Sequence, residues 1–125
     1  MPTIADYLVI RDGSFELVAG ETELSQGFSI PSDLVPGTDK AKAILAYKAW
    51  PPQVDPFAST ADLMIRVNGT QIGTFAIELD TVRGLWETFP ATILNADSDA
   101  NFVQYSCEAG RIRISDVILW FQRRI

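Results

Sequence analysis

ADLMIRVNGTQIGTFAIEL, residues 61–79, contains two runs of alternating apolar and polar side chains joined by an Asn-Gly pair. Asn-Gly between two such runs is the strongest short-range signal for a β-hairpin with a two-residue turn. Successive strand residues point to opposite faces, so Leu63, Ile65 and Val67 share one face, which we expect to be buried. The stretch therefore predicts an antiparallel hairpin that turns at Asn68-Gly69.

The return run does not keep the alternation of a plain hairpin. If the turn has two residues, Ile72 lies on the face of Ile65, but the apolar residues after Gly73 have the opposite parity. Those residues are Phe75, Ile77 and Leu79. One extra residue at Gly73, a β-bulge, would bring Ile72 and all three of them inward.

Short apolar runs fill the rest of the chain, with turn residues about every 8–12 positions. Asp12-Gly13 predicts a second hairpin turn, Pro90 predicts an edge or bulged strand, and residues 20–27 and 95–101 are polar connections. Residues 40–50 contain helix formers, but Pro51-Pro52 and the missing capping box favour a strand. The expected strands are Tyr7–Arg11, Ser14–Ala19, Phe28–Ile30, Lys40–Trp50, Leu85–Leu94, Phe102–Cys107, Arg111–Ile114 and Val117–Gln122.

These patterns predict an all-β fold, an antiparallel jelly-roll β-sandwich of about 8–10 strands. We expect one domain over residues 1–125, because a chain of this length buries about two thirds of the surface of its unfolded state. Apolar residues make up 47% of the chain, which excludes the disordered class. No apolar run has the length of a membrane span, and residues 1–13 do not resemble a secretory signal. We therefore expect a soluble chain that is intracellular or already processed.

The chain contains no histidine and only one cysteine, Cys107. Without imidazole it cannot form the serine and cysteine triads that use histidine, nor the common zinc sites. Cys107 can form no intrachain disulfide, and its parity predicts a buried thiol. Glu78, Asp80 and Glu87 could in principle pair as glycosidase acids, but no spacing selects them. We therefore predict that the protein is not an enzyme.

The net charge of −6 arises from residues 1–39, which hold seven acids and one base, Arg11. An acidic chain is poorly suited to a phosphate backbone, which argues against nucleic acid as a partner. The C-terminal end is basic, with arginines at Arg111, Arg113, Arg123 and Arg124. These arginines either pair with acids of the same molecule or dock on the acidic end of another copy.

From residue 61 to residue 121 the order of features resembles the galactose-binding-domain-like jelly rolls, the β-sandwich fold of many carbohydrate-binding modules. The resemblance rests on ADLMIRVNGTQIG, on a tryptophan strand followed by ATILNAD, and on NFVQYSC before GRIRISDVILWF. It implies a non-catalytic module that binds glycans through loops or one sheet face and often carries a structural calcium ion. Asp116 looks like the acidic residue before the last strand of calcium-bearing members.

Three groups of residues are candidates for binding. Trp50 and Trp86, near strand ends, could stack on sugar rings, while Arg83 and Glu87 could bind the hydroxyls. Asp97, Asp99 and Asn101 are spaced by two, as in loops that wrap calcium, although such residues also stabilise plain turns. With Asp116 they are the predicted metal ligands. The final strand is apolar on both faces, so it is either central or covered by a partner at Ile118 and Trp120.

We therefore predict a non-catalytic binding module that recognises a carbohydrate or similar polyol. The alternative is a structural subunit of a larger assembly, such as a virus-like, tail or appendage particle, that uses its sandwich faces as protein interfaces. A homo-oligomer or an assembly partner is the corresponding expectation, and calcium is the one candidate cofactor.

Overall fold

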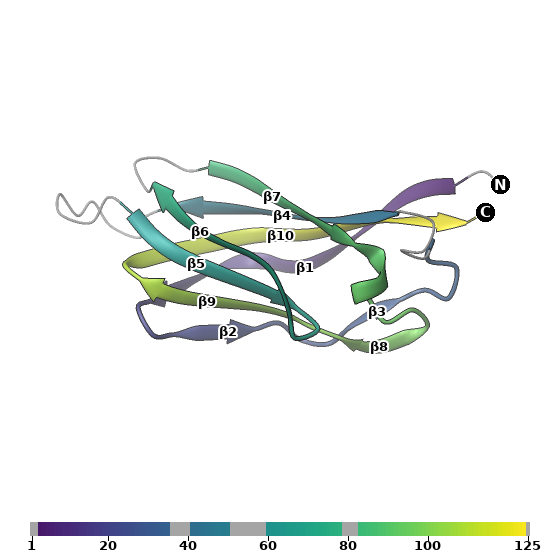
Figure 1. Ribbon diagram of the computed structural model, residues 1–125, viewed down its shortest axis with the longest axis horizontal. Helices are drawn as coiled ribbons and strands as arrows, with labels where there is room; N and C mark the ends of the chain where they lie inside the picture. Colours follow the sequence, from purple (N-terminus) through teal and green to yellow (C-terminus); the bar gives the residue numbers. More distant parts are fainter. Residues whose placement is uncertain (1–2, 36–40, 51–59, 79–82, 125) are drawn as a thin grey trace.

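The computed structural model describes residues 3–35, 41–50, 60–78 and 83–124, without the side chains of residues 60, 75–78 and 83. Two four-stranded antiparallel sheets pack face to face, which confirms the predicted β-sandwich (Figure 1). The first sheet consists of β1 (Thr3–Val18), β10 (Arg111–Arg124), β4 (Lys42–Trp50) and β7 (Arg83–Pro90), in that order. The second consists of β2 (Thr22–Leu24), β9 (Val103–Ala109), β5 (Thr60–Val67) and β6 (Thr70–Glu78).

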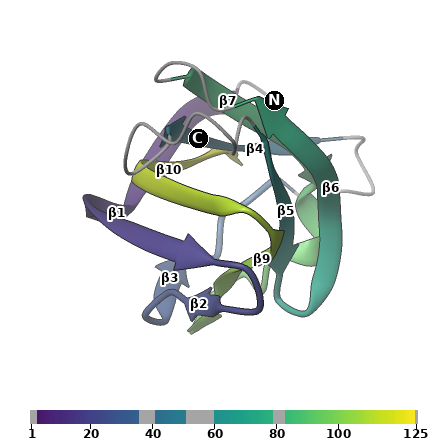
Figure 2. The same ribbon diagram turned by 90° about the vertical axis from the view of Figure 1, so that its left-hand side faces the viewer.

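A short third sheet pairs β3 (Phe28–Ile30) with β8 (Ser98–Asn101), and a 3₁₀ helix covers Ala91–Ile93. In the view along the molecule's long axis, the two large sheets enclose the interior (Figure 2). Both described ends of the chain lie at the same end of the sandwich (Figure 1). No helix in the described ranges is long and apolar enough to cross a membrane.

The core forms where the inward-facing residues of the two sheets meet. Each strand contributes alternate residues, as the sequence pattern predicts. Fully buried members include Leu45 on β4, Leu63 and Ile65 on β5, Val103 on β9, and Ile112, Ile114 and Leu119 on β10. Cys107 is buried among them, as predicted, and burial raises the pKa of its thiol.

The central hairpin forms as the sequence predicts. Val67 pairs with Thr70, and both turn residues have positive φ, 51° at Asn68 and 81° at Gly69. This conformation matches the twist of the flanking strands and suits Asn and Gly. The bulge lies at Ile72, next to Gly73, because Ile65 faces Gly73 whereas Arg66 faces Gln71. Ile72 packs against the core as predicted; the side chains of residues 75–78, and all of Leu79 and Asp80, lie outside the described part.

The hairpin predicted at Asp12-Gly13 is wrong. β1 continues through these residues, and both of its halves pair with β10 rather than with each other. Arg11 faces Val117 and Ser14 faces Ser115, so Asp12 and Gly13 form an irregularity opposite Asp116. The strands predicted at 111–114 and 117–122 are likewise one strand, β10. β10 forms backbone hydrogen bonds with both halves of β1. A local turn at Asp12-Gly13 would lose the bonds of one half.

Other boundaries differ less from the prediction. The strand predicted at residues 40–50 is β4, and Pro90 ends β7, an edge strand of the first sheet. The two regions predicted to be polar connections contain the short strands β2 and β8. β10 lies between β1 and β4, so the last strand is central in its sheet. Its outer face is exposed at Trp120, and cover by a partner stays a prediction.

Arginines of the C-terminal end pair with acids of the same molecule. Arg123 donates two hydrogen bonds to the Asp33 carboxylate, at 2.8 and 2.9 Å, and one to Asp6 at 3.0 Å. Arg111 lies 3.6 Å from a carboxylate oxygen of Glu16. These contacts support intramolecular pairing over docking between copies.

The cluster of Arg123, Asp6 and Asp33 predicts that part of the folding stability is lost in acid. The backbone N–H of Tyr7 and then Arg123 lower the pKa of Asp6, and Arg123 lowers the pKa of Asp33, from the ordinary value of 3.8. A lowered folded-state pKa contributes stability that is present above about pH 4 and is lost as the pH falls through the folded value. We expect the midpoint temperature of thermal unfolding to decrease as the pH is lowered from about 4 to about 2. Arg123→Gln should make this decrease in midpoint temperature smaller.

Glu87 acts in the opposite sense, because burial raises its pKa and the folded state therefore favours its neutral form. The contribution of Glu87 to stability grows as the pH falls. Glu87 is present in both the wild type and Arg123→Gln, so the difference between the two proteins reports on Arg123 alone. Equal pH dependence in the two proteins would contradict the role assigned to Arg123.

Candidate functional site

The outer face of the first sheet carries apolar side chains on all four strands, although this face lies away from the core. Cross-strand register places them in two adjacent rows, because directly opposed residues share a face. One row is Tyr7, Trp120 and Ile44, and the other is Val9, Ile118, Ala46 and Trp86. We call these seven residues the tryptophan face. Tyr7, Val9, Ile44, Trp86 and Trp120 are exposed.

A hollow of about 340 Å³ lies on this face and is lined by Ile44, Ala46, Trp86 and Trp120. The Trp86 side chain is 66% exposed and Trp120 is 40% exposed, so both indoles offer area to a ligand. The Tyr7 ring supports Trp120, with ring centroids 4.9 Å apart and planes tilted by 40°. Trp86 and Trp120 are two strands apart and offset by about two residues, which places their Cα atoms about 12 Å apart.

Polar side chains lie beside this hollow on the same face, on the side of Ile44 and Trp120. Thr88 is the cross-strand partner of Ile44, and Lys42 precedes Ile44 by two residues. Gln122 follows Trp120 by two residues, and all three polar side chains are exposed. The rim therefore supplies hydroxyl, ammonium and amide groups beside an apolar floor.

The predicted ligand-binding residues are not all brought together. Trp86 lies on the tryptophan face, whereas Glu87 pairs with the buried Leu45 and so has inward parity. Glu87 is half-buried, and its negative charge adds to burial in raising the pKa of Tyr47. Trp50 has outward parity but is half-buried near the end of β4, four residues beyond Ala46. The Arg83 side chain lies outside the described part.

Asn101, a predicted metal ligand, has its carboxamide committed to protein partners. It is fully buried, and its Oδ1 accepts hydrogen bonds from Asn68 Nδ2 at 3.0 Å and from the Asn95 backbone N–H at 2.8 Å. Its Nδ2 lies 3.0 to 3.3 Å from the carbonyl oxygens of Asn95, Ser98 and Phe28. Both lone-pair directions of Oδ1 are therefore used, and this residue stabilises a turn rather than fitting a cation site.

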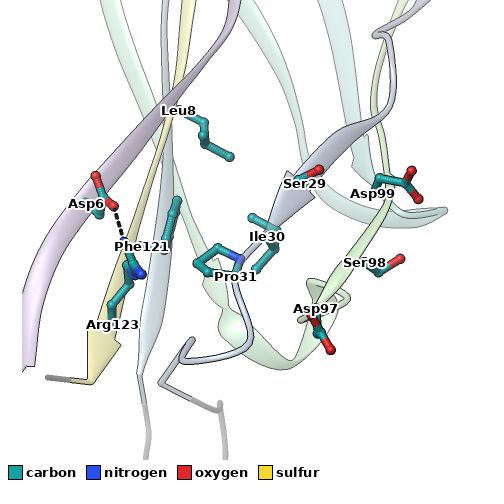
Figure 3. Close-up of a pocket in the computed structure, with 10 residues that line it drawn as sticks. All are labelled: Asp6, Leu8, Ser29, Ile30, Pro31, Asp97, Ser98, Asp99, Phe121 and Arg123. Carbon is teal, nitrogen blue, oxygen red and sulfur yellow. Dashed lines mark hydrogen bonds and ion pairs between the residues drawn. The ribbon is translucent and has the colours of Figure 1, made fainter.

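The three predicted aspartate ligands do not gather at one point. Asp97 and Asp99 line a cavity of about 690 Å³ across from Asp6 and Arg123, and their carboxylates point in different directions (Figure 3). Asp116 is seven residues from Arg123 along β10, about 23 Å away, and its carboxylate contacts Lys48 at 3.4 Å. Within the described ranges, no three His, Cys, Asp or Glu side chains gather as a metal site. Calcium binding stays a prediction.

Sequence reasoning missed four members of the tryptophan face, Tyr7, Val9, Ile44 and Ala46. A sequence signal for these residues does exist. Their strands carry apolar residues at outward-facing positions, as the last strand does. Their meeting with Trp86 and Trp120 depends on the order β1-β10-β4-β7, which connects distant parts of the chain. Ile118 and Trp120, the predicted interface residues, do lie on this face, Ile118 half-buried and Trp120 exposed.

The chain matches no protein-family model and no curated protein. Among solved structures, it is similar to dimeric latent PorU from Porphyromonas gingivalis, with a TM-score of 0.62 and 10% identity. The similarity covers 98% of this chain but 13% of PorU, so the chain spans about an eighth of that protein's length. At this identity the likeness shows the fold alone.

Carbohydrate-binding proteins are also among the similar structures, as the sequence resemblance leads one to expect. The sugar-binding EclA C-terminal domain has a TM-score of 0.49 and 11% identity, over 94% of this chain and 79% of that one. The xylan-binding CBM22-1 domain of Paenibacillus barcinonensis Xyn10C has a TM-score of 0.47 and 10% identity, over 95% and 87%. Both TM-scores lie below 0.5.

Proposed function

We propose that this chain is a binding module that holds a carbohydrate or similar polyol against the tryptophan face. The observation that carries the proposal is the hollow between Trp86 and Trp120, two exposed indoles on one sheet face. Pyranose rings present C–H groups on their faces, and these pack on aromatic rings while the hydroxyls at the ring edge bind polar groups. Thr88, Lys42 and Gln122 are the proposed partners of such hydroxyls, because they are exposed on the same face beside the hollow.

The floor of the hollow favours an uncharged ligand, and the Lys42 ammonium beside it can donate hydrogen bonds to the hydroxyls of such a ligand. All four residues that line the hollow are apolar. Lys48, farther along β4, is paired with Asp116, which offsets its charge. A neutral glycan requires stacking area and hydrogen bonds rather than a charged partner, and this combination is what the face provides. The proposed role requires no catalytic group.

Trp86→Ala and Trp120→Ala should each weaken glycan binding about tenfold or more, because each removes one stacking surface worth about 1.5 kcal/mol. A glycan array first identifies a ligand for the wild type, and isothermal titration calorimetry then measures the dissociation constants. Both residues are exposed, so circular dichroism should show an unchanged fold.

Glu87→Gln is the matched control, since Glu87 is adjacent to Trp86 in sequence but faces inward. It should bind the same ligand with unchanged affinity. Failure of the wild type to bind any glycan on the array would refute the proposal. Equal losses in Glu87→Gln and Trp86→Ala would show that the face is not what binds.

The alternative function, a subunit of a larger assembly, is favoured by a different aspect of the same face. Exposed apolar residues occur on all four strands, and such a face can be covered by another protein. Light scattering on the wild type distinguishes the two functions. A stable oligomer that dissociates on Trp120→Lys substitution supports assembly, whereas a glycan-binding monomer supports the binding module.

A further inference from the structure

β1 is an edge strand of the first sheet, and its outer side pairs with no described strand. From Thr3 to Val9 it pairs with β10 in continuous register, without a bulge. Edge strands of this kind present unpaired backbone groups to solvent, which can add a strand from another molecule. The stretch is therefore a surface at which association must be either used or prevented.

Hydrogen bonds on the side of β10 that faces away from β1 establish which backbone N–H and C=O groups of β1 face the free edge. The Arg124 N–H donates to the Asp33 carbonyl, and the Gln122 carbonyl accepts from the Val35 N–H, both at 2.9 Å. Backbone groups of successive strand residues point to alternate sides. The backbone groups of Phe121 and Arg123 therefore point toward β1, where these residues face Asp6 and Ile4.

It follows that the backbone groups of Asp6 and Ile4 point toward β10, whereas those of the odd-numbered residues point away from it. Thr3, Ala5, Tyr7 and Val9 thus direct their N–H and C=O groups to the free edge. Tyr7 and Val9 are also more than half exposed on the tryptophan face, at 52% and 55%. A strand added here would gain both backbone hydrogen bonds and apolar contacts.

The Tyr7 N–H is already occupied by a side chain of its own strand. It donates to Asp6 Oδ1 at 2.8 Å. The second oxygen of the same carboxylate accepts from Arg123 Nη1 at 3.0 Å, and Arg123 is itself held by two hydrogen bonds to Asp33. Asp6 is therefore held by hydrogen bonds from both the Tyr7 N–H and Arg123, and Figure 3 shows its contact with Arg123.

Asp6 is also the only charged residue between Thr3 and Val9. Without it, this stretch is an uncharged edge with Ile4, Tyr7 and Val9 exposed. Two copies of one strand are complementary to each other in the antiparallel orientation, because a two-fold axis relates them. β1 of a second copy is therefore a strand that fits this edge, and charged residues are the usual protection against such pairing.

We propose that Asp6 guards the free edge of β1, capping the Tyr7 N–H and so preventing antiparallel pairing with β1 of a second copy of this chain. The role is separate from the binding function of the tryptophan face, and neither depends on the other. Asp6 acts as a positioned blocking group that takes no part in chemistry.

Asp6→Ala should increase the weight-average mass toward a dimer in light scattering, at protein concentrations where the wild type keeps its own mass. Asp33→Asn is the matched control, because it removes the charge that holds Arg123 but leaves the carboxylate of Asp6 to cap the edge. It should keep the wild-type mass.

A second substitution tests whether the new contact uses this edge. Ala5→Pro removes an N–H that faces the edge and no bond to β10, and proline is tolerated at such positions. Asp6→Ala combined with Ala5→Pro should return to the wild-type mass. A dimer that persists in the double variant would overturn the proposal, as would association of Asp33→Asn equal to that of Asp6→Ala.

Amide hydrogen exchange tests the cap in the wild type, independently of whether any variant folds. Tyr7 and Ala5 both direct their N–H groups to the edge, but only Tyr7 has the carboxylate as acceptor among the described contacts. The protection factor of Tyr7 should exceed that of Ala5 by about tenfold. Equal protection would overturn the proposal, as would a folded Asp6→Ala variant that retains the wild-type mass at all concentrations.

Discussion

Replacing Asn101 by alanine should lower the free energy of unfolding by about 3 kcal/mol, measured by urea denaturation. The residue is fully buried where β8, the turn at Asn68 and the end of β3 meet. Alanine would leave the Asn95 N–H and the carbonyl oxygens of Asn95 and Ser98 without this partner. An unsatisfied buried polar group costs about 1–3 kcal/mol, so the losses add to a large effect.

Asn95→Ala is the matched control for this prediction. The Asn95 side chain makes a single exposed hydrogen bond, to the Ala100 carbonyl at 2.9 Å, so its removal should cost less than about 1 kcal/mol. Asn101→Asp, which nearly preserves the shape, should still destabilise, because it turns a carboxylate oxygen toward carbonyl oxygens. A loss below about 1 kcal/mol for Asn101→Ala would contradict the network described here.

Leu119→Ala should lower the free energy of unfolding by about 3 kcal/mol, within the range of 2–5 kcal/mol seen for buried leucines. Leu119 is fully buried on β10, the strand between β1 and β4, and faces Leu8 and the buried Leu45. Close packing from both neighbouring strands limits the collapse of the cavity that alanine would leave. Denaturant unfolding with an unchanged m-value checks the size of the loss.

The adjacent residue provides the comparison. Ile118 is half-buried on the tryptophan face, so Ile118→Ala should cost about 1 kcal/mol. The difference between two neighbouring substitutions measures the difference between the two faces of β10. Equal losses would mean that the outer face is as closely covered as the core, which would favour an assembly partner over the free binding face.

The candidate site could be predicted only in part because its members belong to four strands. Local patterns predict Trp86 as a ligand-binding residue and Trp120 as an interface residue, and do not connect the two. Their contribution to one hollow requires β4 to lie between their strands. Glu87 was predicted to share a site with Trp86 because the two are adjacent in sequence. Strand alternation instead directs neighbouring residues to opposite faces.

Asn101 illustrates why a spacing pattern was insufficient for the predicted metal ligands. Asp97, Asp99 and Asn101 have a spacing that suits either a cation loop or a turn. The distinction depends on what lies around Asn101, and those partners include Phe28 and Asn68, which are distant in the sequence. Local spacing carries no information about such partners.

The sequence by itself determined the β-sandwich class, the Asn68-Gly69 turn, the neighbouring bulge and the inward parity of most strands. These features depend on side-chain alternation and on the positive φ of two turn residues, which are local properties. Only the tertiary structure decided that β1 continues past Asp12-Gly13, that Trp86 and Trp120 line one hollow and that Asp6 accepts a hydrogen bond from the Tyr7 N–H. These features depend on the pairing of β10 with β1 and β4 and of β4 with β7, and such long-range pairing is not encoded in any single stretch.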